Sequence, residues 1–125
     1  MPKRVLIVDD VEQVARHLRR LVIQAAPSAT VEVFYDADVA RRCAGDTPFD
    51  LAVLDLNIGP QSGVVLARDL LVASPRLKIV FVTGETGSPQ AAEARALAPV
   101  AILEKPFAGE ALKTVVRHAL ETAAE

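Results

Sequence analysis

This sequence has a single cysteine, no tryptophan and no large excess of one charge, and each of these features excludes a class of protein. Cys43 is the only cysteine in 125 residues, which excludes an internal disulfide and a multi-cysteine metal site. There is no Trp, and 14 Lys and Arg face 16 Asp and Glu, for a net charge of −2. With no basic block, the sequence carries no electrostatic footprint for nucleic acid.

Long hydrophobic runs are missing as well. No apolar run approaches the roughly 20 residues that cross a bilayer, and the four apolar residues at 5–8 are too few for a signal-peptide core. We therefore expect a cytoplasmic protein with no membrane contact. What the sequence does have is 51% hydrophobic and 24% charged residues, which suits one folded domain over residues 1–125.

Short apolar runs alternate with longer amphipathic segments along the chain. The runs are rich in β-branched residues, which predicts strands at residues 5–8, 31–34, 51–54, 79–82 and 100–103. The apolar spacing between them predicts helices at residues 11–25, 36–45, 64–71, 88–98 and 109–124. We expect Asp10 to cap the first helix, Gly45 to close the second, and Ser88 with Pro89 to begin the fourth.

Five strand–helix units in succession predict an α/β fold. Strands in this pattern form a parallel sheet with right-handed crossovers and helices on both faces. An open, doubly wound sheet of five strands fits the length, whereas a closed eight-stranded barrel needs about twice as many residues.

In open α/β sheets, ligands bind beyond the carboxyl ends of the strands. Polar residues stand at these positions after four of the predicted strands. They are Asp9 and Asp10 after the first strand, Asp55 after the third, Thr83 after the fourth and Lys105 after the fifth. Adjacent carboxylates repel each other and are costly to desolvate, so a divalent cation among them would explain them. Oxygen-only ligation favours Mg²⁺, and a carboxylate beside this ion can accept a phosphoryl group. Asp55 stands alone, which makes it the better nucleophile candidate.

Four motifs occur together in this chain: VLIVDD, LAVLDLNIGPQSG, FVTGE and EKPF. Their order and separations, 45 residues from Asp10 to Asp55 and 22 from Thr83 to Lys105, resemble those of the CheY-like receiver domains of two-component response regulators. The match runs from residue 5 to about residue 123. The resemblance implies a flavodoxin-like fold with strand order 2-1-3-4-5 and five helices. It implies a phosphoacceptor signalling switch.

The resemblance also assigns a role to each matching residue around the acids. Asp55 would be the phosphoacceptor. Asp9 and Asp10 would hold Mg²⁺, or alternatively Mn²⁺, together with Asp55 and the backbone carbonyl of Asn57. Asn57 and Glu85 would flank the path of the water that removes the phosphoryl group, so we expect this group to last seconds to minutes.

Three further residues belong to the implied phosphoryl and switch machinery. Thr83 and Lys105 would contact the phosphoryl group, and the peptide bond before Pro106 would be cis. An aromatic residue often stands where this chain has Ile102, so a switch that couples threonine to an aromatic side chain is not expected in that form. Ala98–Pro99 and Gly59–Pro60 also depart from the commoner family residues.

The implied partners follow from the same resemblance. A sensor histidine kinase or a histidine phosphotransfer protein would donate the phosphoryl group. A downstream protein would bind the face made by the fourth helix, the fifth strand and the fifth helix. We expect a monomer or weak homodimer, stand-alone or part of a longer regulator or hybrid kinase. It would catalyse only its own phosphorylation and dephosphorylation, and so would not be a conventional enzyme.

Two alternatives remain beside this interpretation. A hydrolase of the haloacid-dehalogenase type needs a second Asp two residues after the nucleophile, where this chain has Asn57. A pseudo-receiver would be an interaction module that never accepts phosphate, and its usual sign is the loss of an acidic residue from the pocket. No such loss occurs here.

Overall fold

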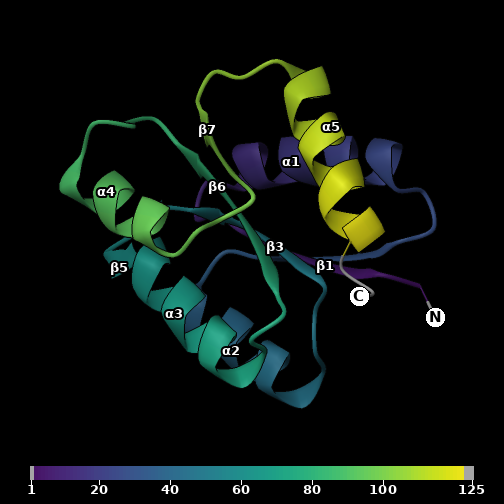
Figure 1. The fold of residues 1–125 in the computed structure, drawn as a ribbon, viewed down its shortest axis with the longest axis horizontal. Helices are drawn as coiled ribbons and strands as arrows, with labels where there is room; N and C mark the ends of the chain where they lie inside the picture. Colours follow the sequence, from purple (N-terminus) through teal and green to yellow (C-terminus); the bar gives the residue numbers. More distant parts are fainter. Residues whose placement is uncertain (1, 123–125) are drawn as a thin grey trace.

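The computed structural model describes residues 2–122, which contain one five-stranded parallel sheet with helices on both faces (Figure 1). The sheet strands are β1 (Arg4–Val8), β2 (Thr30–Phe34), β3 (Leu51–Asp55), β6 (Lys78–Thr83) and β7 (Ala101–Glu104). The helices are α1 (Glu12–Ala25), α2 (Ala37–Asp46), α3 (Gly63–Ala73), α4 (Pro89–Ala96) and α5 (Gly109–Thr122). The order β2-β1-β3-β6-β7 is the implied order 2-1-3-4-5.

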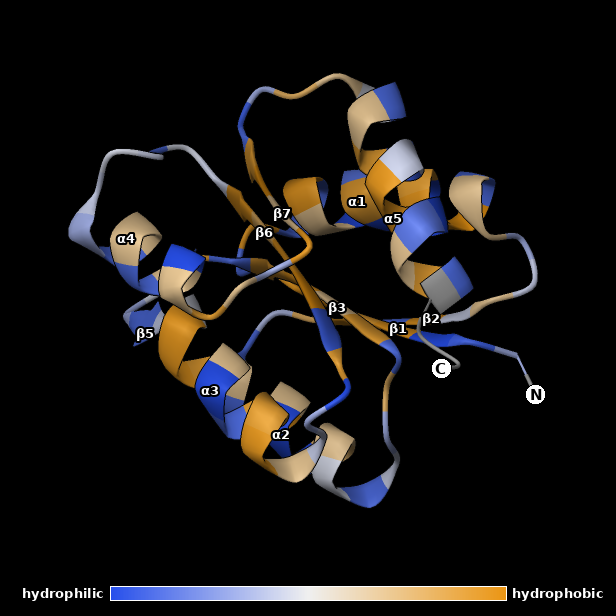
Figure 2. Cartoon of the chain, viewed as in Figure 1, coloured by the Kyte–Doolittle hydropathy of each residue, from blue (hydrophilic) through white to orange (hydrophobic). Residues whose placement is uncertain are grey.

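The alternation of side chains along the strands builds a core on each face of the sheet. Leu6, Leu54 and Phe81 point to the face that α2, α3 and α4 cover. Ile7 and Val53 point to the opposite face, under α1 and α5. Figure 2 shows the hydrophobic colour concentrated in the central strands and on parts of the helices. Because β1 and β3 are buried on both faces, their carboxyl ends are held rigidly.

Two predicted helix boundaries are wrong. Asp10 does not cap α1, because the N-cap is Val11, which makes no side-chain capping bond, and the Val11 amide donates instead to Asp9 Oδ1 at 2.9 Å. Gly45 does not close α2, which continues to Asp46 and ends at Thr47 in an extended conformation. Gly45 does not adopt the left-handed conformation that makes glycine a helix terminator.

A hairpin that the sequence did not predict follows β3. Its strands are β4 (Asn57–Ile58) and β5 (Gln61–Ser62), paired antiparallel around Gly59, whose φ is +60°. Ser62 then caps α3 by accepting from the Val65 amide. Each predicted strand and the capping of α4 by Ser88 ahead of Pro89 are confirmed.

Residues 123 and 124 of the predicted last helix lie outside the described residues. Within residues 2–122, no helix combines the length and the apolar character needed to cross a membrane.

Candidate functional site

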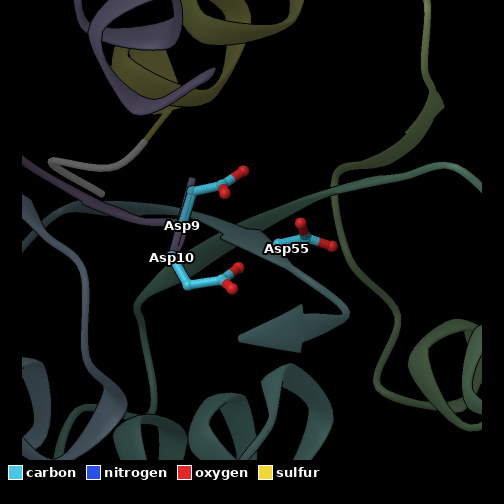
Figure 3. A group of neighbouring side chains, drawn as sticks. All are labelled: Asp9, Asp10 and Asp55. Carbon is cyan, nitrogen blue, oxygen red and sulfur yellow. The ribbon is translucent and has the colours of Figure 1, made fainter. Parts of the chain in front are cut away.

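Asp9, Asp10 and Asp55 meet at the carboxyl edge of the sheet. The register of β1 with β3 places Val8 beside Leu54, so the residues that follow in each strand reach the same level. One carboxylate oxygen from each of the three acids lies within 4.8 Å of the others. Figure 3 shows the three side chains directed toward a common space. Asp9 is fully buried, Asp55 is half-buried and Asp10 is exposed, so the cluster opens to solvent on one side.

Lys105 completes the cluster from the other end of the chain. Its Nζ donates to Asp55 Oδ2 at 2.9 Å and to Asp9 Oδ2 at 3.3 Å. The Lys105 amide donates to the carbonyl of Thr83 at 2.7 Å, which fixes the backbone beyond β7 against β6. The Lys105–Pro106 peptide bond is cis, as expected.

The acidic groups of this cluster outnumber its one lysine. Burial raises the pKa of the Asp9 carboxyl, and the charge of Asp55 adds to this effect; the Val11 amide and Lys105 lower it without cancelling it. Burial alone lowers the pKa of Lys105, but its hydrogen bond to Asp55 and the charges of Asp9 and Asp55 outweigh burial and raise it. Lys105 is therefore held as an ammonium, while ionisation of the Asp9 carboxyl is disfavoured by its burial.

Thr83 lies at the same edge, but its hydroxyl is engaged locally. The side chain is buried, and its Oγ1 accepts from the Glu85 amide at 3.1 Å. The Glu85 carbonyl lies 3.5 Å from the same oxygen. Thr83 therefore holds the start of the loop between β6 and α4, with Glu85 exposed to solvent beside it.

Ile102 is half-buried and packs against the core under α2, α3 and α4. It lies on the strand next to β6, where it pairs with Phe81. The aliphatic side chain therefore belongs to the hydrophobic core and carries no polar group to the acid cluster.

The loop after Asp55 contains contacts that the sequence analysis missed. The Asn57 amide donates to Asp55 Oδ1 at 3.2 Å and so orients the carboxylate. Gly63 packs so closely against this segment that a Cβ atom would lie 1.8 Å from the Asp55 carbonyl oxygen. The glycine that ends the motif GPQSG is the sequence signal for this contact, because only a residue without Cβ fits there.

The donor set fits a hard divalent cation. Three carboxylates converge, with no His or Cys side chain in the cluster, and one lysine offsets only part of their charge. Burial raises the pKa of the Asp9 carboxyl, so a further positive charge beside it would favour its ionised form. The three acids are therefore able to hold a metal ion.

A hollow of about 290 Å³ lies beside Lys105. It is lined by the first turns of α1 and by the segment after β7, through residues Gln13, Val14, His17, Lys105, Pro106 and Phe107. His17 is exposed and stacks on Phe107 with 6.5 Å between ring centroids. Because Lys105 lines it, the hollow lies next to the acid cluster.

The chain is similar in sequence and in fold to known proteins. The family model described as "Response regulator receiver domain" matches residues 5–117. The transcriptional regulatory protein FixJ of Rhizobium meliloti is 31% identical over 119 residues, which cover 95% of this chain and 55% of FixJ. The chain thus spans about half the length of this relative.

Two solved structures show the same fold. A CheY-like receiver domain protein from Methanospirillum hungatei superposes with a TM-score of 0.89 at 21% identity, covering 99% of this chain and 98% of that one. A response regulator from Burkholderia pseudomallei, solved with a phosphorylated aspartic acid, a calcium ion and citrate, gives a TM-score of 0.80 at 28% identity. It covers 98% of this chain and 71% of its own.

Proposed function

This chain belongs to the response regulator receiver domain family of two-component signalling, and we propose that Asp55 is its phosphoacceptor. The observation that carries the proposal is the position of Lys105 Nζ, 2.9 Å from Asp55 within a cluster of three carboxylates. The Burkholderia relative supports it, since that protein contains a phosphorylated aspartic acid and a metal ion.

The proposed reaction needs little covalent machinery. A carboxylate oxygen of Asp55 attacks the phosphorus of a phosphohistidine on a sensor kinase or phosphotransfer protein. The new O–P bond forms as the N–P bond breaks, and the histidine nitrogen keeps the electron pair. Phosphoryl transfer of this kind depends on positioning and charge neutralisation. Lys105 is placed to neutralise the charge of a phosphoryl oxygen, because its ammonium already forms an ion pair with the Asp55 carboxylate.

Asp9, Asp10, Asp55 and the backbone carbonyl of Asn57 are the residues that we propose hold Mg²⁺, or Mn²⁺ in its place. When bound, the ion supplies positive charge to the equatorial phosphoryl oxygens. Asn57 has a second role, because its amide orients Asp55. The hydrolytic step returns the carboxylate when water attacks phosphorus and the aspartyl O–P bond breaks, so the domain acts on itself and not on a released substrate.

The signal is proposed to travel through Thr83. Its hydroxyl now bonds the backbone of Glu85, and a phosphoryl group on Asp55 would compete for that hydroxyl. Release of Glu85 would loosen the loop that leads to α4. Because Ile102 is an aliphatic core residue, we place the response in this loop and in the α4–β7–α5 face, where a protein target binds. We propose a cytoplasmic monomer or weak homodimer that binds no nucleic acid.

The test is direct phosphorylation with a small donor. Wild-type protein incubated with Mg²⁺ and acetyl phosphate should gain one phosphoryl group by intact mass spectrometry. Asp55→Asn should gain none, and chelation of Mg²⁺ should prevent the gain in the wild type. Asp46→Asn, which changes an exposed acid at the end of α2, is the matched control and should label normally. An unlabelled wild type would support the pseudo-receiver.

The phosphoryl group should be short-lived. Asn57 and Glu85 are both exposed and leave the water path open, so we expect a half-life of seconds to minutes in the isolated Mg²⁺-loaded protein. Loss of the added mass after removal of the donor measures this half-life. Persistence over many hours would contradict the prediction without affecting the assignment of Asp55.

A further inference from the structure

We propose that Gln61 is a positioning residue for the metal site: its Oε1 accepts from the Ala37 amide at 3.0 Å and thereby fastens the loop after Asp55 to the N-terminus of α2. This inference rests on the proposed function, because its consequence is the Mg²⁺ affinity of the acid cluster. The side chain does not itself belong to the acid cluster, and 24 residues separate the two bonded groups.

The hairpin that carries Asn57 needs anchors. Its strands contain two residues each, with Asn57 opposite Ser62 and Ile58 opposite Gln61. A two-stranded ribbon of this size is not stable on its own. The proposed metal-binding carbonyl of Asn57 is therefore only as well placed as the contacts that hold the hairpin.

Besides the bonds of Asn57 to Asp55 and of Ser62 to Val65, three further contacts hold the hairpin, and two of these do not involve a polar side chain. Ile58 is buried in the core under α2, α3 and α4. Gly63 donates its amide to the carbonyl of Leu56 at 2.8 Å. Gln61, which pairs with Ile58 across the hairpin, provides the third contact, because its side chain accepts a hydrogen bond from α2.

The N-terminus of α2 explains why the Ala37 amide needs an acceptor from outside the helix. Asp36 caps the helix, and its Oδ1 accepts from the amides of Asp38 and Val39. The amide of Ala37 is not among the donors that Asp36 satisfies, and Ala37 is fully buried. An acceptor from elsewhere must serve this buried donor, since a helix leaves its first amides without internal partners. Gln61 is that acceptor, and the partial positive charge of the helix end strengthens the bond.

The decisive experiment compares two substitutions of Gln61. Gln61→Met keeps the unbranched length and removes the amide oxygen, whereas Gln61→Glu keeps an acceptor for Ala37. Titration calorimetry with MgCl₂ alone should show about tenfold weaker binding by Gln61→Met, the size of effect expected for a residue that orients metal ligands. Gln61→Glu should restore affinity to within about threefold of wild type.

Hydrogen exchange adds a readout independent of the metal. In metal-free protein, the Ala37 amide should be protected in the wild type and in Gln61→Glu, and should exchange at least about tenfold faster in Gln61→Met. Ala92→Gly, in the exposed interior of α4 and away from the contact between Gln61 and Ala37, is the control for overall stability. It should lower thermal stability while leaving the Mg²⁺ affinity unchanged.

The outcomes distinguish a failure of the proposed function from a failure of the role of Gln61. A wild type that binds no Mg²⁺ and gains no phosphoryl group would overturn the proposed function itself. If the wild type binds and labels but Gln61→Met has the same affinity, the role of Gln61 is wrong and the proposed function stands. Equal weakening by Ala92→Gly would also overturn the role of Gln61, because the effect would then come from overall stability.

Discussion

Asp9 shows how one residue can lower stability and still serve the site. It is fully buried, and its ionised form is disfavoured by desolvation and by the charge of Asp55. Lys105 offsets this only in part, since its ammonium lies closer to Asp55 than to Asp9. The folded protein therefore carries a local charge imbalance that a cation can relieve.

Removing the Asp9 charge should stabilise the metal-free protein. Asp9→Asn keeps an oxygen for the Val11 amide and removes the buried anion, so we expect the free energy of unfolding in chelator to rise by about 1 kcal/mol. Urea denaturation followed by circular dichroism measures the change. The same variant should lose the response of its stability to Mg²⁺, since a proposed ligand is gone.

Asp38→Asn is the comparison for this prediction, because Asp38 is an exposed acid on α2 that pairs with Arg41. It should leave metal-free stability within about 0.5 kcal/mol of wild type. A metal-free Asp9→Asn protein less stable than wild type would show that the contact with Lys105 outweighs the cost of burial.

At the scale of elements, the connection from α4 to β7 is conformationally strained. α4 ends at Ala96, and Ala98 adopts φ 53°, the left-handed region, immediately before Pro99. It is the only non-glycine residue with positive φ among residues 2–122. This connection leads into the α4–β7–α5 face, so its backbone geometry helps to set how α4 and β7 lie relative to each other.

Replacing Ala98 by glycine should relieve the strain. The left-handed conformation costs a residue with a Cβ about 1–2 kcal/mol, and the added freedom of glycine in the unfolded chain returns part of this. We expect Ala98→Gly to raise the free energy of unfolding by about 0.5–1 kcal/mol, measured by urea denaturation. Ala92→Gly, in the exposed interior of α4, should instead lower it by about 1 kcal/mol. Destabilisation by both glycines would refute strain at Ala98.

At the scale of the whole molecule, the site exists only when the chain is folded. Asp9 and Lys105 are 96 residues apart, and the parallel sheet alone brings their strands to one edge. A metal that binds this assembled site and not the unfolded chain must stabilise the fold.

Mg²⁺ should therefore raise the melting temperature of the protein. At a concentration about 100 times the dissociation constant, the added stability is about 2.7 kcal/mol, which shifts the melting temperature of a domain of this size by several degrees. Scanning calorimetry with and without Mg²⁺ measures the shift. Asp10→Asn should abolish most of it, and Asp46→Asn should retain it. A wild type that melts at the same temperature in Mg²⁺ and in chelator would exclude binding at this cluster.

The sequence by itself determined the strands, the parallel sheet and the residues at its carboxyl edge. These depend on local periodicity and on the rule that parallel strands end at one edge, so Asp9, Asp55 and Lys105 were predictable as a group. The family motifs added the strand order. Only the tertiary structure decided that Asp10, which the sequence had placed both in the cluster and at the start of α1, does not cap that helix, and that Gln61 bonds the amide of Ala37. Such contacts join groups far apart in the chain, and their geometry depends on packing distances that no local pattern encodes.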